Sequence, residues 1–221
     1  MKLVECSACE VGLASGVGRG QFCPFIDRKV PAGTTVFAAG APADHVWFVR
    51  GGTVVLSREP AAGESGPPRA HAIRFAGSFV GLEVLVSPVY ADTATAATDV
   101  YLCGATRDGI DVWLGARGTP ARTALEMTLR ASGLDRPRES TRDGSAVTRL
   151  ARWLLDEGPR GVTMGVPRHV IADLLGMRPE TLSRALGELA RRGAIEATRT
   201  TLTILDESPL AAAAAGAFDT D

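Results

Sequence analysis

The sequence has few cysteines, few aromatic residues and no long apolar runs. Its 221 residues include four cysteines, and Phe, Trp and Tyr together make up 5%. No apolar run approaches the roughly 20 residues of a membrane-spanning helix, and the first residues lack the apolar block of a signal peptide. We therefore expect a cytoplasmic protein with no membrane partner, in a reducing compartment where disulfides are rare.

The sequence also lacks a bias toward one sign of charge. Its 24 Lys and Arg residues face 25 Asp and Glu residues, which gives a net charge of −1. That balance gives no global sign of a nucleic-acid partner. The length suits two compact domains, and the 45% hydrophobic and 22% charged content excludes wholesale disorder.

The few cysteines are unevenly placed. Cys6, Cys9 and Cys23 stand among glycines in the first 24 residues, where no periodic pattern is present and we expect irregular backbone, and Cys103 stands alone. In a reducing cytosol such a cluster indicates a metal or redox site rather than disulfides. These four cysteines are therefore candidate metal ligands.

Short β-rich runs separated by turns follow the cysteine segment. Their spacing of roughly ten residues predicts a sandwich, jelly roll or barrel. Gly51-Gly52 between two runs predicts a tight hairpin, and the polar residues 63–68 predict another hairpin tip. The runs are residues 34–37, 45–49, 53–56, 71–75 and 100–103.

The remainder of the chain has helical patterns and one polar interruption. Residues 133–144 are polar and contain Pro137, as expected of a connection between domains. The alanine-rich end is expected to be frayed. We therefore expect a cysteine-containing N-terminal segment (1–24), a β-domain (25–113), a connecting helix and linker (114–145), a C-terminal domain (146–208) and a flexible tail (209–221).

Residues 167–196 have the pattern of a helix-turn-helix. Gly176 ends one short apolar helix and Pro179 opens a second, whose buried stripe is Leu182, Leu186 and Leu189. Two short strands around residues 198–200 are expected to form a wing. Residues 146–205 hold nine arginines and six acids, a local charge of +3 that the whole-chain balance conceals.

The opposite face of the second helix carries groups that can read DNA. Arg can donate two hydrogen bonds to guanine, Glu can accept one from cytosine, and Ser can serve either role or contact phosphate. This chemistry predicts a DNA interface, although an ordinary helical hairpin with a solvated charged face would share the pattern. The candidate DNA contacts are Glu180, Ser183, Arg184, Arg178, Thr181, Arg191, Arg199 and His169.

These motifs resemble the CRP/FNR superfamily of bacterial transcription regulators over most of the chain. Residues 180–184 are similar to the E-x-x-S-R signature of the FNR branch, and residues 46–53 and 77–81 resemble the family's β-domain motifs. The resemblance implies an α+β fold with an N-terminal double-stranded β-roll, a dimerisation helix and a C-terminal winged helix-turn-helix. It also implies a homodimer on double-stranded DNA with TTGAT-like inverted repeats, and leaves RNA polymerase open as a further partner.

The resemblance also indicates which ligand or cofactor the β-domain uses as a sensor. Asp92 stands where a cyclic-nucleotide sensor needs an arginine, and its charge would repel a phosphate, so we expect no cyclic nucleotide. FNR-type oxygen sensors hold an iron–sulfur cluster of the 4Fe–4S type with three N-terminal cysteines and one from the β-roll. Cys6, Cys9, Cys23 and Cys103 resemble that division, which implies control by O₂, NO or redox state.

Other interpretations of the cysteines remain open. The CxxC pair could be half of a zinc site or a free redox pair, and Cys103 could be a small buried hydrophobe. Haem ligated by His45 or His71 is a further alternative. A CxxC thiol oxidoreductase would need the pair at a helix N-terminus after a strand in a βαβ unit, and no such unit precedes it. We therefore expect a regulator and not an enzyme.

Overall fold

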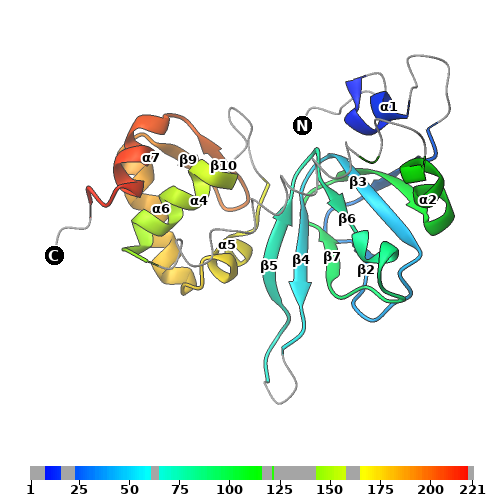
Figure 1. Ribbon diagram of the computed structural model, residues 1–221. Helices are drawn as coiled ribbons and strands as arrows, with labels where there is room; N and C mark the ends of the chain where they lie inside the picture. The colour runs from blue at the N-terminus through cyan, green and yellow to red at the C-terminus, as the bar shows by residue number, and fades with distance from the viewer. Residues whose placement is uncertain are drawn as a thin grey trace. The chain divides into compact units, whose positions relative to one another are not determined.

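A computed structural model describes residues 8–15, 23–60, 65–115, 121, 143–157 and 165–218. The chain divides into two compact units, Met1–Ser132 and Gly133–Asp221, both drawn in Figure 1. Across these described ranges, no helix is long and apolar enough to cross a membrane. The expected dimerisation helix and linker, residues 114–145, lie almost entirely outside the described residues.

Two four-stranded antiparallel sheets form the β-structure of the first unit. Their strand orders are β1-β8-β3-β6 and β2-β7-β4-β5. The sheets confirm the predicted β-roll, and the β4–β5 pair confirms the hairpin expected around residues 63–68. The strands are β1 (Ile26–Val30), β2 (Thr35–Phe37), β3 (His45–Gly51), β4 (Val54–Arg58), β5 (Arg69–Arg74), β6 (Phe79–Val80), β7 (Thr93–Ala96) and β8 (Val100–Thr106).

The hairpin expected at Gly51-Gly52 is wrong. β3 pairs with β6 and β8, whereas β4 pairs with β5 and β7, so the two glycines carry the chain from one sheet to the other. Gly52 has a φ of +89°, and a Cβ there would lie 2.4 Å from the carbonyl oxygen of Asp99. Both the backbone conformation and the close approach require glycine, which is the same signal that a tight turn would leave in the sequence.

Short helices accompany the sheets of the first unit. They are α1 (Glu10–Ala14), the 3₁₀ helix η3 (Leu82–Leu85) and α2 (Arg107–Gly115). The expectation of irregular backbone throughout residues 1–24 is therefore wrong at α1, where Val11 and Gly12 are buried. α2 contacts β8 and β3 and buries Ile110 and Trp113. Figure 1 shows α1 and α2 near β3 within this unit.

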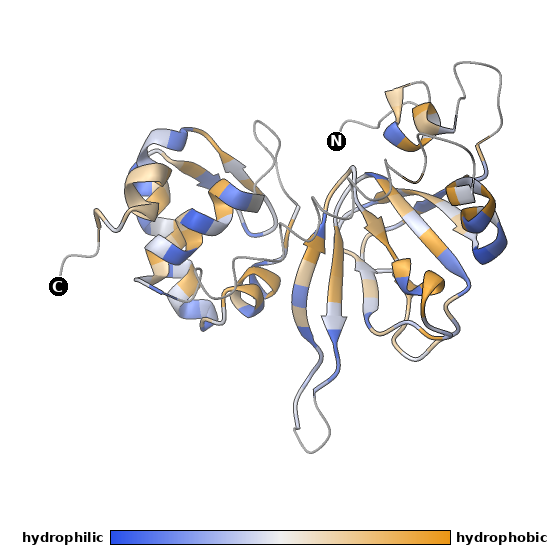
Figure 2. Ribbon diagram, in the orientation of Figure 1, coloured by the Kyte–Doolittle hydropathy of each residue, from blue (hydrophilic) through white to orange (hydrophobic). Residues whose placement is uncertain are grey.

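The second unit is a helical domain with a two-stranded wing. Its elements are α4 (Ala146–Glu157), α5 (Arg168–Leu174), α6 (Pro179–Arg191), β9 (Ile195–Ala197), β10 (Leu202–Ile204) and α7 (Glu207–Ala214). β9 and β10 pair antiparallel, and the helices bury apolar residues and leave their described charged residues exposed or half-buried. Figure 2 shows hydrophobic and hydrophilic residues interleaved along these helices, as expected of helices with one buried side.

The flexible tail expected at residues 209–221 is wrong where the structure describes it. Residues 207–214 form α7, which packs against α4, and Leu210 and Ala213 are fully buried. The Asp206 side chain caps α7 by accepting a hydrogen bond from the Ser208 N–H over 2.8 Å. Leu210, directly before the run of alanines, supplies apolar packing that alanine side chains alone would lack.

Candidate functional site

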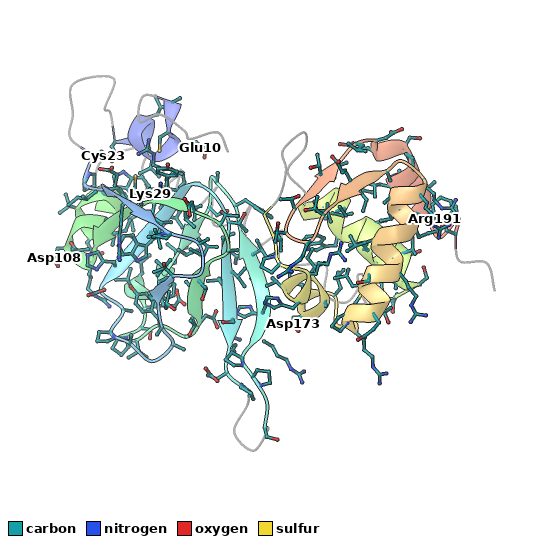
Figure 3. All side chains as sticks on the ribbon, turned by 180° about the vertical axis from the view of Figure 1, so that it is seen from behind. Glu10, Cys23, Lys29, Asp108, Asp173 and Arg191 are labelled. Carbon is teal, nitrogen blue, oxygen red and sulfur yellow. The ribbon has the colours of Figure 1, made fainter. Side chains whose placement is uncertain are left out.

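Three of the four candidate cysteines line one cavity in the first unit. Cys9 precedes α1, Cys23 precedes β1 and Cys103 lies in β8, so three separate segments bring them together. The cavity has a volume of about 240 Å³, and Val11, Gly12, Phe25, Asp27 and Arg50 complete its lining. Figure 3 labels Cys23 beside α1. The fourth candidate, Cys6, lies outside the described residues.

The three thiols are shielded from water to different degrees. Cys9 is 4% exposed and Cys103 7%, whereas Cys23 is half-buried, and none of these three forms a disulfide. Burial raises the pKa of Cys9, and the backbone amides of Gly12 and Val11 and the charge of Arg50 oppose that rise. A metal would therefore have to displace a proton from Cys9 at neutral pH, which makes ligation at this residue dependent on pH.

Two polar contacts connect the cavity thiols to the surrounding fold. The Oγ of Ser15 lies 3.7 Å from the Sγ of Cys23 and donates to the carbonyl of Val11 over 2.7 Å. The Ser15 hydroxyl in turn accepts a hydrogen bond from the Trp113 indole over 2.8 Å. On the sheet side, the Nη1 of Arg50 lies 3.8 Å from the Sγ of Cys103.

Asp92, which stands where a cyclic-nucleotide sensor needs an arginine, interacts with two basic side chains. Asp92 is buried, and its carboxylate accepts from Arg58 Nε over 2.8 Å and lies 2.9 Å from His71 Nε2. His45, the second candidate haem ligand, lies with its Nδ1 2.8 Å from the Asp44 carboxylate. Neither histidine lines the cysteine cavity.

The helix-turn-helix of the second unit is built as the sequence predicts. Gly176, with a φ of +56°, follows α5, and the Met177 N–H donates back to the Ala172 carbonyl over 3.0 Å, which closes the helix end. Pro179 is the first residue of α6. Four apolar side chains of α6 are buried: Leu182, Ala185, Leu186 and Leu189.

The candidate DNA contacts lie mostly on the exposed surface of the second unit. Glu180, Ser183 and Arg184 are exposed on the opposite side of α6 from its buried stripe, and Arg199 is exposed between β9 and β10. Arg178, Arg191 and His169 are also exposed, and Thr181 is half-buried. Arg191 differs from the others because its guanidinium donates to the Glu188 carboxylate on the same helix.

The two units match two known domain families. A family described as a cyclic nucleotide-binding domain matches residues 27–114, and one described as a Crp-like helix-turn-helix domain matches residues 148–213. The solved structure of FixK2 from Bradyrhizobium japonicum has the same fold, with a TM-score of 0.70 at 22% identity over 85% of this chain and 96% of that chain. These matches define a β-roll sensor domain followed by a DNA-binding domain.

Curated relatives match most of the chain. The CRP-like cAMP-activated global transcriptional regulator of Mycobacterium tuberculosis is 27% identical over 196 residues, 82% of this chain and 84% of the relative. The fumarate and nitrate reduction regulatory protein of Salmonella typhimurium is 25% identical over 204 residues, 86% of this chain and 79% of the relative. Together with the domain matches, these relatives support a DNA-binding transcription regulator of the CRP/FNR family. Since these relatives are regulators, the expectation of a protein that is not an enzyme is confirmed.

The sequence did not reveal the polar residues around the thiols. Arg50 belongs to a motif that the sequence already indicated, but its proximity to Cys103 depends on the pairing of β3 with β8. Ser15 and Trp113 are 98 positions apart, and no periodic pattern joins them. Cross-strand register and long-range side-chain contacts are set by the tertiary fold, so a single sequence carries no direct signal of them.

Proposed function

We propose that this chain is a DNA-binding regulator controlled by a 4Fe–4S cluster held by cysteine thiolates. The observation that carries the proposal is the meeting of Cys9, Cys23 and Cys103 in one cavity of about 240 Å³. Cys6, three positions before Cys9, is the proposed fourth ligand and lies outside the described residues. When bound, the cluster would supply sensitivity to O₂, NO or redox state, because iron–sulfur clusters are modified by these agents.

A single metal ion and a cluster place different demands on the thiols. A zinc ion would need its sulfur ligands at about 2.3 Å from a single point. In the described part of the chain, no three His, Cys, Asp or Glu side chains form a group that could hold one ion. In a 4Fe–4S cluster each thiolate binds a different iron, so the ligands surround a larger volume. The proposal assigns the three cavity thiols to different irons of one cluster.

The positions of Asp92, His45 and His71 also argue against a cyclic nucleotide or haem as the ligand of the proposed sensor. The Asp92 carboxylate, with Arg58 and His71 bound to it, occupies the position where a cyclic phosphate would need an arginine. His45 and His71 both lie against carboxylates outside the cavity, so the metal-binding side chains of its described lining are the three thiols and Asp27. The activation by cAMP that the mycobacterial relative's name states is therefore not proposed for this chain.

The DNA-binding domain is proposed to act in a homodimer on TTGAT-like inverted repeats. Glu180, Ser183 and Arg184 lie on the exposed side of α6, near its N-terminal end, where recognition helices meet base edges. Arg178, Thr181, Arg191, Arg199 and His169 are proposed as further DNA contacts. RNA polymerase is a further proposed partner.

Anaerobic purification followed by metal and sulfide analysis tests the cluster directly. We expect a coloured protein with absorbance near about 400 nm and with both iron and acid-labile sulfide. The same sample should bind a TTGAT-type operator and release it after exposure to O₂ or NO. Zinc without sulfide would indicate a zinc site and overturn the cluster. A colourless, metal-free protein with unchanged operator affinity would overturn the sensor proposal.

A further inference from the structure

Arg50 is a buried cation placed at an irregularity of the sheet. It is 7% exposed and lines the cysteine cavity. Between Val49, which lies opposite Leu102, and Gly51, which lies opposite Tyr101, the register of β3 against β8 shifts, so Arg50 is the extra residue of a β-bulge. Bulges change the direction of a side chain locally. This one accompanies a guanidinium that reaches the cavity.

The guanidinium lies beside the thiol that the β-roll contributes. Its Nη1 is 3.8 Å from the Sγ of Cys103, which is within hydrogen-bonding range for sulfur. Arg50 also lines the cavity that Cys103 shares with Cys9 and Cys23. One cation thus borders thiols from both the sheet and the N-terminal segment.

A guanidinium this close to the thiols would act electrostatically on an anionic centre that they hold, because the interior screens charge less than water does. A 4Fe–4S centre with four thiolates carries a net negative charge, and hydrogen bonds to its sulfurs and nearby charge set its reduction potential. We propose that Arg50 is a positioning residue for the cluster, which orients Cys103 and offsets the negative charge of the bound thiolates. The inference rests on the proposed function, because it assigns a role toward that same centre.

Substitutions at Arg50 separate this role from simple packing. Arg50→Gln removes the charge and keeps a polar side chain, whereas Arg50→Lys keeps the charge and loses the planar fork. Arg28→Gln is the matched control: Arg28 is exposed on β1 of the same sheet, near the Trp47 ring and outside the cavity lining. All four proteins are reconstituted anaerobically with iron and sulfide. Their midpoint potentials are then measured by reductive titration, and their metal-free forms are unfolded with urea.

The expected result is a change in potential that follows charge at position 50. Arg50→Gln should favour the oxidised form about tenfold in the one-electron equilibrium, a shift of about 59 mV to lower potential. Arg50→Lys should recover most of that shift, and Arg28→Gln should match the unsubstituted protein. The Arg50→Gln protein should also lose its absorbance faster in O₂. A loaded Arg50→Gln protein with unchanged potential and O₂ sensitivity, and with altered urea unfolding alone, would overturn the role of Arg50 and leave the proposed function intact. An unsubstituted protein that takes up no iron would instead overturn the proposed function.

Discussion

The indole Nε1 of Trp113 donates a hydrogen bond of 2.8 Å to the hydroxyl of Ser15, and both side chains are buried. Ser15 follows α1 and lies next to Cys23, whereas Trp113 belongs to α2 and packs edge-on against Phe25, with ring centroids 5.4 Å apart. The bond therefore joins the N-terminal cysteine segment, which precedes the β-roll strands, to α2, which follows the last of them. Through the contact of Ser15 with Cys23, the bond holds the end of α1 beside the cavity without a bound metal.

A double-mutant cycle of Trp113→Phe and Ser15→Ala should measure this bond. Each single substitution should destabilise the metal-free protein by about 1–3 kcal/mol, because each leaves a buried polar partner unsatisfied or removes a hydrogen bond. The pair should show a coupling of at least about 0.5 kcal/mol. Urea unfolding of the four proteins gives the coupling, and Trp47→Phe in β3 controls for loss of an indole. Additive effects would show that the contact contributes nothing to stability.

Burial of Cys9 predicts that the metal-free protein loses stability at alkaline pH. The pKa of Cys9 is raised in the folded state, so folding favours the protonated thiol. The associated stability is present below the ordinary thiol pKa and is lost as pH rises through the higher folded value. Unfolding free energies measured across that alkaline range should fall more steeply for the unsubstituted protein than for Cys9→Ser. Parallel curves for the two proteins would contradict the prediction.

Metal binding should show the opposite dependence on pH. A thiolate is the ligand, so protonation of Cys9 competes with iron, and reconstitution should become less complete as pH falls. Iron and sulfide content after reconstitution at several pH values measures this. Cys9→Ser lacks a proposed ligand and should take up less iron and sulfide at every pH, whereas uptake by the unsubstituted protein that does not change with pH would contradict the prediction.

Local patterns predicted the elements better than the connections between them. The leucine stripe of α6, Gly176 and Pro179 act within a few residues of each other, so the sequence located the helix-turn-helix well. Gly52 was misinterpreted because a crossing between sheets and a tight hairpin require the same backbone freedom. α7 was missed because its buried residues, Leu210 and Ala213, give no clear periodic pattern in an alanine-rich stretch. The neighbours of the cysteines followed from strand register and were beyond a sequence pattern.

Removal of the Leu210 side chain tests the importance of α7. Leu210 is fully buried, so Leu210→Ala should lower the free energy of unfolding by about 2–5 kcal/mol. Ala211→Ser, at an exposed position of the same helix, should cost about 0.5 kcal/mol or less. Urea unfolding followed by circular dichroism compares the two. Equal small effects would mean that residues 207–214 add little to the second unit.

Arg184 is expected to read one base pair. Its exposed guanidinium on α6 can donate two hydrogen bonds to a guanine, and Arg184→Ala should cost about 1–3 kcal/mol at that position. Competition binding against single-base variants of a TTGAT-type operator should show relaxed preference at one symmetric pair of positions. An unchanged specificity profile with lower overall affinity would assign Arg184 to the phosphate backbone instead.

Arg199 should act on DNA of any sequence, because it lies in the wing and not on the recognition helix. Two interactions of Thr198 stabilise the turn of the wing: its Oγ1 lies 2.6 Å from the Thr201 Oγ1, and its carbonyl accepts a hydrogen bond from Arg168 over 3.0 Å. Arg199, the next residue in the turn, is exposed. Arg199→Ala should weaken binding to operator and unrelated DNA alike, and should reduce the slope of log affinity against log salt concentration by about one. Arg28→Ala in the first unit removes the same charge and should leave both quantities unchanged. A loss confined to one operator position would instead place Arg199 on a base edge, because only a base contact distinguishes one sequence from another.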